Sequence, residues 1–298
     1  MHLPCVPLNK SLRYSSFYGA NIINVDLHSH STVSDGVLLP AKVAQRAHAN
    51  GVQLWALTDH DELNGLDQAE AAAQELGMGF IPGIEISVTW SGQTVHVVGL
   101  NIDRHYPALA AGLADVRQGR EGRARQMADK LASLGIEGAY EGALAYAANS
   151  AMVSRTHFAR YIVAHGYCNS LQEVFDRYLG DGKPGNVRVQ WSSLEHAVGW
   201  ILGAGGRAVI AHPGRYKYTA MQFDALFENF KDLGGQAIEV VTGSHTVSQY
   251  EEYAKVAKRY GFMASCGSDF HSPTEARLDL GKLPPLPSGL TPVWHDWV

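Results

Sequence analysis

The stretch VDLHSHSTVSDG, residues 25–36, places two histidines and an aspartate directly after a short apolar run. His28 and His30 are two residues apart, and side chains at that spacing in an extended strand lie on the same face. Both rings can therefore reach one metal ion. Asp35 follows in a Ser-Asp-Gly turn, where it can ligate the same site or cap the turn. This stretch predicts a strand whose end carries a metal site.

Five further clusters of the same residue types are spread over the chain, most of them at the ends of apolar runs. They are His60 in ALTDH, Glu85 in IPGIEIS, His96 in TVHVVGL, His212 in AVIAHPG, and Asp269 with His271 in ASCGSDFH. An apolar run buries a strand in its sheet and its last residues reach the edge, so we expect the clusters to converge. Histidine and carboxylate ligands without cysteine suit Mn²⁺, Zn²⁺ or Fe²⁺. Nine such ligands are enough for two or three ions.

Several of these residues allow a second interpretation. Glu85 sits in a strongly apolar strand, where a carboxylate is costly unless it is paired or metal-bound, so we expect it to bridge two ions. His96 lies inside an apolar strand and can instead be a core histidine. Asp59, beside His60, can ligate, can orient a ligand histidine or can cap the following helix. His245 follows a strand in VTGSH, and we expect it to line the pocket without ligating.

The order of the elements predicts an α/β fold with a helical insertion. Residues 22–103 and 204–298 alternate between strands and helices, which implies a parallel sheet or barrel. Residues 104–203 contain few strand-like runs. Helices are expected there at 107–134, 138–148, 154–166, 170–180 and 191–204. Residues 1–21 form an N-terminal extension in this interpretation.

The composition narrows the class of protein. The 298 residues carry a net charge of −5, which argues against a broad nucleic-acid surface, and the chain has no apolar run long enough to span a membrane. The three cysteines, Cys5, Cys168 and Cys266, are odd in number and far apart, so we expect reduced thiols in a cytoplasmic protein. The middle of the chain is relatively rich in arginine, which fits a solvated helical surface or an anionic substrate.

The motifs DLHSHSTVSDG, TDH, AHP and GSDFH resemble those of the PHP (polymerase and histidinol phosphatase) family of the amidohydrolase superfamily. The resemblance implies a distorted (β/α)₇ TIM-like barrel with its site at the carboxyl ends of the strands. It also implies two or three divalent ions, most often Mn²⁺ with Zn²⁺ or Fe²⁺ as alternatives, and cleavage of phosphate esters. The implied ligand groups are His28, His30, Glu85 and Asp269; Glu85, His96 and His212; and Asp35, His60 and His271.

Motifs in and beside the inserted segment resemble one subgroup of this family. SRTHFARYIVAHG, FDRYLGDGKPGNV and AHPGRY are similar to the subgroup that acts on nucleoside 3′,5′-bisphosphates or degrades short RNA from its 5′ end. The insertion would then cap the active site and hold the second phosphate. The implied substrate-phosphate binders are Arg155, His157, Lys183, Arg215 and His245. Arg215 would also offset charge on the transferred phosphoryl group, and His271 or a water molecule would protonate the leaving oxygen.

We therefore expect a metal-dependent phosphatase that converts adenosine 3′,5′-bisphosphate to AMP and phosphate. The alternatives are a 5′–3′ exoribonuclease on short 5′-phosphorylated RNA, a histidinol phosphatase, and a non-catalytic, metal-dependent nucleotide-binding module. The expected partner is a small nucleotide or a short RNA. Nothing in the sequence indicates a membrane or an obligate protein partner.

Overall fold

A computed structural model describes residues 23–297 of the chain, so the predicted extension at 1–21 lies outside the described residues. Seven strands form one sheet in sequence order: β1 (Val25–Asp26), β2 (Leu54–Leu57), β3 (Gly79–Trp90), β4 (Gln93–Leu100), β5 (Arg207–Ile210), β6 (Ala237–Thr242) and β7 (Met263–Gly267). All neighbours pair in parallel except at β4, which is antiparallel to both β3 and β5.

The two edges of the sheet meet and close it into a barrel. The Leu27 N–H donates to the Cys266 carbonyl at 3.0 Å, and the His30 N–H donates to the Phe270 carbonyl at 2.8 Å. Gly267 lies at this seam, where an added Cβ would collide with His28, so the close approach requires glycine. The predicted distorted (β/α)₇ barrel is confirmed, and the distortion lies in the β3–β4 hairpin, which takes the place of one strand–helix unit.

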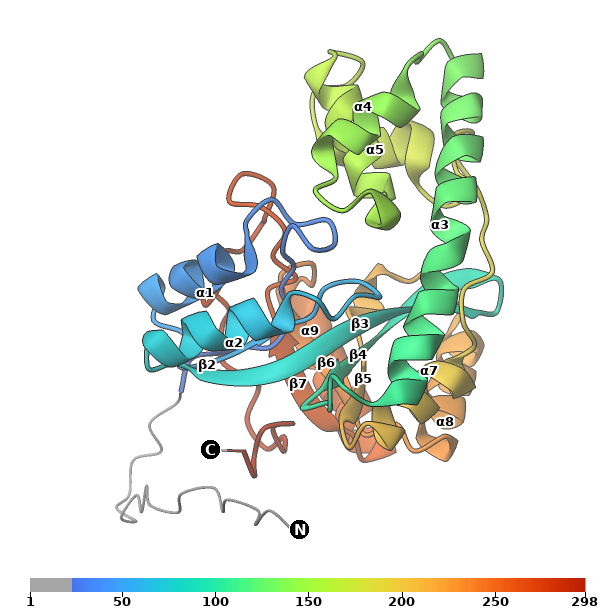
Figure 1. The fold of residues 1–298 in the computed structure, drawn as a ribbon. Coiled ribbons are helices and arrows are strands. Elements are labelled where there is room, and N and C mark those ends of the chain that lie inside the picture. The colour runs from blue at the N-terminus through green and yellow to red at the C-terminus, as the bar shows by residue number, and fades with distance from the viewer. Residues whose placement is uncertain (1–22, 298) are drawn as a thin grey trace, which may run out of the picture.

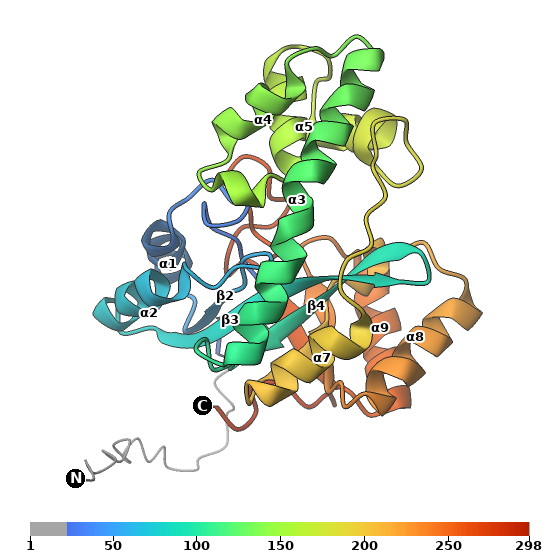
Figure 2. The ribbon, with the colours of Figure 1, turned by 45° about the vertical axis from the view of Figure 1, so that its right-hand side comes forward.

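The helices cover the outside of the barrel and build a second unit beside it. They are α1 (Pro40–Ala49), α2 (Leu66–Glu75), α3 (Pro107–Ser133), α4 (Ala139–Tyr146), α5 (Arg155–Ala164), α6 (Leu171–Val174), α7 (Leu194–Gly203), α8 (Ala220–Asp232) and α9 (Val247–Tyr260). Figure 1 shows α1 and α2 on one side of the barrel, α7 and α8 on the other, and α9 behind the strands. The long helix α3 rises from the barrel to the cluster of α4 and α5, as Figure 2 shows from a second side.

Two hydrophobic cores correspond to these two units. The larger lies between the barrel strands and the surrounding helices, and the smaller is formed by side chains between Ala124 and Val187. This smaller core covers a shorter stretch of sequence than the predicted insertion at 104–203. The rest of that segment, which is α7 and the first turns of α3 with Leu109 and Leu113, packs into the larger core. Among residues 23–297, no helix combines the length and the apolar character needed to cross a membrane.

Candidate metal centre

The barrel brings all nine predicted ligand side chains together at one end. Histidines and carboxylates follow the carboxyl ends of β1, β2, β5 and β7, while Glu85 and His96 lie within the β3–β4 hairpin. Five of the nine are buried, and the side chains of Asp269, His60, His96 and His271 are 9%, 14%, 17% and 20% exposed. Strand ends that are far apart along the chain therefore meet in one site.

Glu85 lies at the centre of the cluster. Its carboxylate is fully buried and faces five imidazole rings. Oε2 lies 3.0 Å from His60 Nδ1, 3.2 Å from His30 Nε2 and 3.3 Å from His28 Nε2, while Oε1 lies 2.9 Å from His96 Nδ1 and 3.0 Å from His212 Nε2. One carboxylate thus contacts imidazoles from four different strands or strand ends, the position expected of a bridging group.

Three groups of donor atoms are close enough to surround an ion. They are His28, His30, Glu85 and Asp269; His30, Asp35, His60 and His271; and His60, Glu85 and His96. The first matches the predicted group, and the second matches it with His30 added. The third contains His60 in place of His212, although His212 also faces Glu85. The clusters can therefore bind divalent metal ions, and His30, His60 and Glu85 each belong to two of them.

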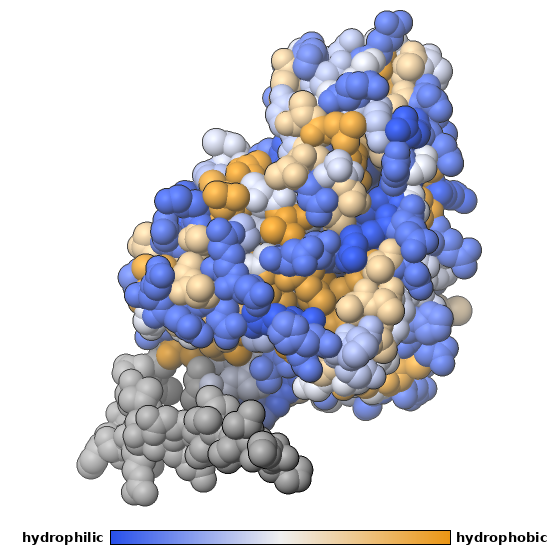
Figure 3. Space-filling model, in the orientation of Figure 1, coloured by the Kyte–Doolittle hydropathy of each residue, from blue (hydrophilic) through white to orange (hydrophobic). Residues whose placement is uncertain are grey.

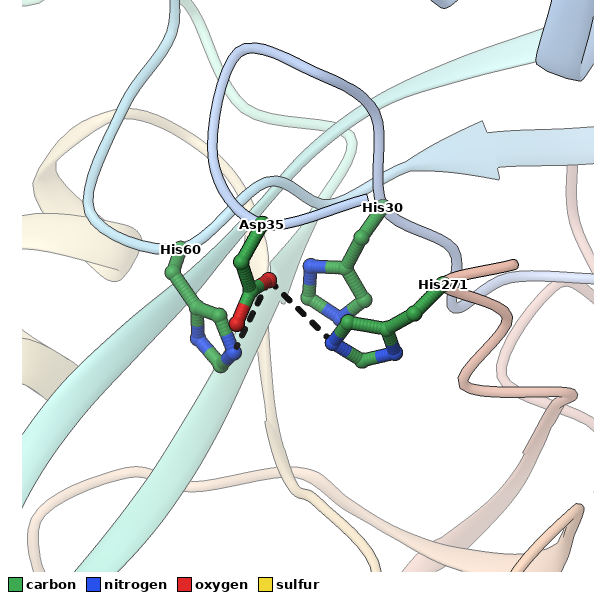
Figure 4. Close-up of side chains that lie close together, drawn as sticks. All are labelled: His30, Asp35, His60 and His271. Carbon is green, nitrogen blue, oxygen red and sulfur yellow. Dashed lines mark ion pairs between the residues drawn. The ribbon is translucent and has the colours of Figure 1, made fainter. Parts of the chain in front are cut away.

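The second group shows how the side chains point toward a common centre (Figure 4). Asp35 Oδ1 lies 3.2 Å from His271 Nε2 and 3.9 Å from His60 Nε2. The rings of His30 and His271 stack with their centroids 4.0 Å apart. These four residues come from three segments, those that follow β1, β2 and β7.

Hydrogen bonding within the protein does not account for this arrangement, whereas metal ions do. Asp35 Oδ1, His60 Nδ1 and Glu85 Oε2 are buried, face the cluster and lack a hydrogen-bond partner among the described residues. Nε2 of His28 also lies 3.1 Å from Nε2 of His30. Because buried polar atoms are costly when unsatisfied, donors converging in this way indicate that cations complete the site.

Glu85 and His212 hold protonation states suited to ligation. Burial opposes ionisation of Glu85, but the charges of His60, His96 and His28 hold its pKa well below the usual range. Burial, and next the nearby Arg215 guanidinium, lower the pKa of His212 to about 3. An ionised carboxylate and a neutral imidazole are the forms that bind metals.

Strained backbone positions cluster at the site. Asp61, His212 and Asp269 adopt φ of 47°, 28° and 55°, a region that non-glycine residues rarely occupy. Such conformations cost about 1–3 kcal/mol each and persist where the surrounding structure holds them. The strain at His212 and Asp269 aims two candidate ligands into the site.

Glu239 on β6 is a functional candidate that the sequence interpretation missed. Its side chain is buried, and Oε1 accepts from His28 Nδ1–H at 2.8 Å while Oε2 accepts from the His212 N–H at 2.6 Å. The first bond keeps the proton on Nδ1 of His28 and leaves the Nε2 lone pair for a metal. The available signal was a glutamate inside the apolar run QAIEVV, the same signal that identified Glu85.

Replacing Glu239 by glutamine is expected to weaken metal binding about 10- to 100-fold, the usual cost of losing a partner behind a ligand histidine. The amide can present its NH₂ group to His28 and favour the wrong tautomer. Titration of the metal-free variant with Mn²⁺, followed by calorimetry, measures the change. Glu228→Gln, at an exposed position on α8, is the matched control. Unchanged affinity in Glu239→Gln would contradict the assigned role.

Two aspartates beside His60 support the site without belonging to the ligand groups. The sequence is compatible with three roles for Asp59. In the structure its carboxylate accepts from the Ser31 N–H and from the hydroxyls of Ser31 and Ser34 at 2.6–2.8 Å, so it holds the loop that leads to Asp35. Asp61 accepts from Ser87 and forms an ion pair with Arg120 of α3. This ion pair attaches the inserted helix to the loop that carries His60.

A cavity of about 240 Å³, here called the first cavity, opens over the cluster. Its lining combines candidate ligands with the three arginines Arg120, Arg123 and Arg155 of the insertion and with Arg215. Arg215 Nη1 lies 2.8 Å from Asp269 Oδ2, so it borders the ligand cluster. Figure 3 shows strongly hydrophilic side chains at the junction of the insertion and the barrel.

The predicted phosphate binders divide into two groups in the structure. Arg155 and Arg215 line both the first cavity and a neighbouring one, whereas Lys183 lines only the neighbouring one. His157 is buried, its Nδ1 accepts from the Ser154 N–H at the start of α5, and burial lowers its pKa to about 4. The ring of His157 thus caps a helix and is absent from the lining of either cavity.

The structure gives His245 a role different from the predicted one. Its ring is buried, Nδ1–H donates to the Val240 carbonyl at 3.1 Å, and Nε2 accepts from the Gly214 N–H at 2.9 Å. Both ring nitrogens are therefore engaged by the backbone and neither is free for a phosphate. His245 instead holds the turn Pro213–Arg215, which carries Arg215.

The chain is similar in sequence to a known family and to known enzymes. The family model described as "PHP domain" matches residues 26–263. A 3′,5′-nucleoside bisphosphate phosphatase of Chromobacterium violaceum is 50% identical over 273 residues, which are 92% of this chain and 96% of that protein. A 5′-3′ exoribonuclease of Haemophilus influenzae is 43% identical over 272 residues, covering 91% and 98%.

A solved structure has the same fold. An amidohydrolase from Chromobacterium violaceum, with bound sulfate and no metal, superposes with a TM-score of 0.89 at 50% identity. The match covers 92% of this chain and 95% of that one.

Proposed function

Since the chain belongs to the PHP domain family, we propose that it is a metal-dependent phosphomonoesterase that removes the 3′-phosphate of nucleoside 3′,5′-bisphosphates. Adenosine 3′,5′-bisphosphate would yield AMP and phosphate. The observation that carries the proposal is the first cavity, whose lining combines candidate metal ligands with arginines of the insertion. The relative at 50% identity, named for this activity, supports the substrate class.

We assign the nine histidines and carboxylates of the cluster as ligands of two or three divalent ions. The oxygen and imidazole donors, without cysteine, favour Mn²⁺, with Zn²⁺ and Fe²⁺ as alternatives. Bound ions of this kind activate water for attack on phosphorus and neutralise charge on the phosphoryl group.

Side chains of the protein itself orient the substrate and neutralise the charge on its phosphoryl group. Arg215, held by Asp269, lies where it can neutralise the phosphoryl oxygens as the bond from phosphorus to the 3′-oxygen breaks. The leaving 3′-oxygen must gain a proton. His271 borders the cavity and can supply the proton only from a ring nitrogen that does not ligate an ion; a water molecule is the other donor.

The second phosphate of the substrate would lie against Arg123 and Arg155. Arg155 is paired with Asp181 at 3.2 Å, whereas Arg123 has no carboxylate within 4 Å in residues 23–297. The Arg123 guanidinium lies 5.0 Å from the centre of the Trp191 ring. Burial, and next the charges of Arg155 and Arg120, lower the pKa of Arg123 to about 9. A partly buried cation beside other cations is a favourable receptor for an anion.

Arg123→Gln is expected to raise KM for adenosine 3′,5′-bisphosphate about tenfold, because a charge-assisted contact worth about 1.4 kcal/mol is lost. kcat should change little, since Arg123 does not contact the reacting phosphate in this arrangement. Steady-state phosphate release measures both constants. Arg125→Gln, on the same helix but 61% exposed and paired with Glu121, is the matched control. Equal KM values for the two variants would remove Arg123 from the site.

Turnover by the Mn²⁺-loaded protein tests the function itself. We expect phosphate release from adenosine 3′,5′-bisphosphate, with histidinol phosphate as a comparison substrate. If no phosphate is released from any nucleotide tested, the remaining hypothesis is the non-catalytic nucleotide-binding module. The specific alternative is 5′–3′ exoribonuclease activity, favoured by relatives of that name at 43% and 40% identity. A 5′-phosphorylated dinucleotide, compared with the bisphosphate at equal concentration, separates the two activities.

We also propose a cytoplasmic location. Cys168 and Cys266 are both buried free thiols in the described part of the chain. Unpaired thiols of this kind are typical of a reducing compartment.

A further inference from the structure

A second cavity of about 540 Å³ adjoins the first one. Five residues line both cavities: Thr94, Arg123, Arg155, Phe175 and Arg215. The two spaces therefore share a wall that contains three arginines. The second cavity extends away from the metal cluster toward the loop at residues 180–189 and toward Lys217.

The second cavity is cationic in a chain whose net charge is −5. Six basic side chains line it against two acidic ones, Asp176 and Asp181. Asp181 already pairs with Arg155, and Asp176 accepts from Gln172 at 3.0 Å. Three further basic residues, Lys183, Arg188 and Lys217, lie away from the shared wall and have no carboxylate within 4 Å in residues 23–297.

The loop that carries Lys183 and Arg188 is attached to its surroundings. The Gly185 N–H donates to the Tyr178 carbonyl at 2.9 Å, and the Gly180 N–H donates to the Phe175 carbonyl at 2.8 Å. Lys130 of α3 donates to the Asn186 carbonyl at 2.6 Å. Because the backbone is fixed at these points, the cations stay on the cavity wall without an acidic partner.

We propose that the second cavity binds a third phosphate group of the substrate, beyond the two of a nucleoside 3′,5′-bisphosphate. This inference rests on the proposed function, which assigns one phosphate to the metal cluster and one to Arg123 and Arg155. A third phosphate can enter across either part of the shared wall. Past Arg123 and Arg155 it would be the outer phosphate of a 5′-diphosphate. Past Arg215 it would be the next phosphodiester of a short oligoribonucleotide.

The test compares substrate pairs that differ by one phosphate. One pair is adenosine 3′,5′-bisphosphate and adenosine 3′-phosphate 5′-diphosphate, and the other is the 5′-phosphorylated di- and triadenylate. The variant is the double substitution Arg188→Gln and Lys217→Gln, since both residues line the second cavity alone. The control is Lys231→Gln with Lys255→Gln, which removes the same charge at exposed positions on α8 and α9.

In the double variant we expect kcat/KM to fall about tenfold for the three-phosphate member of at least one pair. The two-phosphate members should change less than threefold, and the control variant should change neither. The pair that responds identifies the source of the third phosphate. Equal effects on two- and three-phosphate substrates, or no effect on either, would overturn the proposal.

A binding measurement keeps this result separate from the proposed function. If the bisphosphate is not hydrolysed at all, the proposed function fails. Calorimetric Kd values for the same ligand pairs then decide the role of the second cavity. A three-phosphate ligand that binds no more tightly than its two-phosphate partner, in both the unmodified protein and the variant, would contradict the inference.

Discussion

Replacing Glu85 by glutamine is expected to lower kcat/KM for adenosine 3′,5′-bisphosphate by at least about a thousandfold, equivalent to about 4 kcal/mol of transition-state stabilisation. The reason is its position: one buried carboxylate faces five imidazoles from four segments and belongs to two of the three donor groups. Glutamine keeps the volume but removes the negative charge that offsets the cations. Elemental analysis of the purified variant should show the loss of at least one ion per chain, and phosphate release measures the activity.

The control for this substitution is Glu75→Gln, at an exposed position on α2. Circular dichroism and thermal unfolding establish whether Glu85→Gln remains folded. A folded Glu85→Gln protein with its full metal content and activity would show that the cluster is not the catalytic centre.

Removal of metal by a chelator should abolish activity and also destabilise the protein. The ions bind the folded state, where ligands from distant segments meet, and not the unfolded chain. For ions present at 100 to 1,000 times their Kd, the free energy of unfolding should fall by about 3–4 kcal/mol per site. Differential scanning calorimetry before and after chelation measures the corresponding drop in Tm. Separate additions of Mn²⁺, Zn²⁺ and Fe²⁺ then show which ion restores turnover.

Glu85→Gln provides an internal comparison for the chelation experiment. Its Tm should respond less to the chelator, since it holds fewer ions at the start. Activity that survives exhaustive chelation would contradict the proposed metal-dependent hydrolysis, whatever the change in Tm.

The candidate ligands could be found from the sequence because metal ligation demands particular residue types in an unusual place. A carboxylate such as Glu85 inside an apolar strand needs a charged partner, and His28 and His30 share a face because strands have a period of two. Glu239, inside the apolar run QAIEVV, satisfies the same criterion, although the sequence interpretation did not include it. Its partners, His28 and His212, come from β1 and β5.

The substrate residues were harder to predict, because a basic side chain has the same appearance in the sequence whether it binds a ligand, caps a helix or pairs with an acid. His157 and His245 looked like pocket residues, yet backbone groups engage their rings. Arg123 stood in an arginine-rich helix with nothing to separate it from Arg125. Only the fold places Arg123 against Trp191 in the cavity and Arg125 beside Glu121 on the surface.

The sequence by itself determined the repeated strand–helix units, the helical insertion and the identity of the nine candidate ligands, because these follow from local periodicity and from the cost of burying charge. The tertiary structure decided which ligands share a group, which carboxylates support them, and which arginines face the cavities. These properties depend on barrel closure, which brings Leu27 and His30 against Cys266 and Phe270. Contacts between segments more than 200 residues apart have no local signature in the chain.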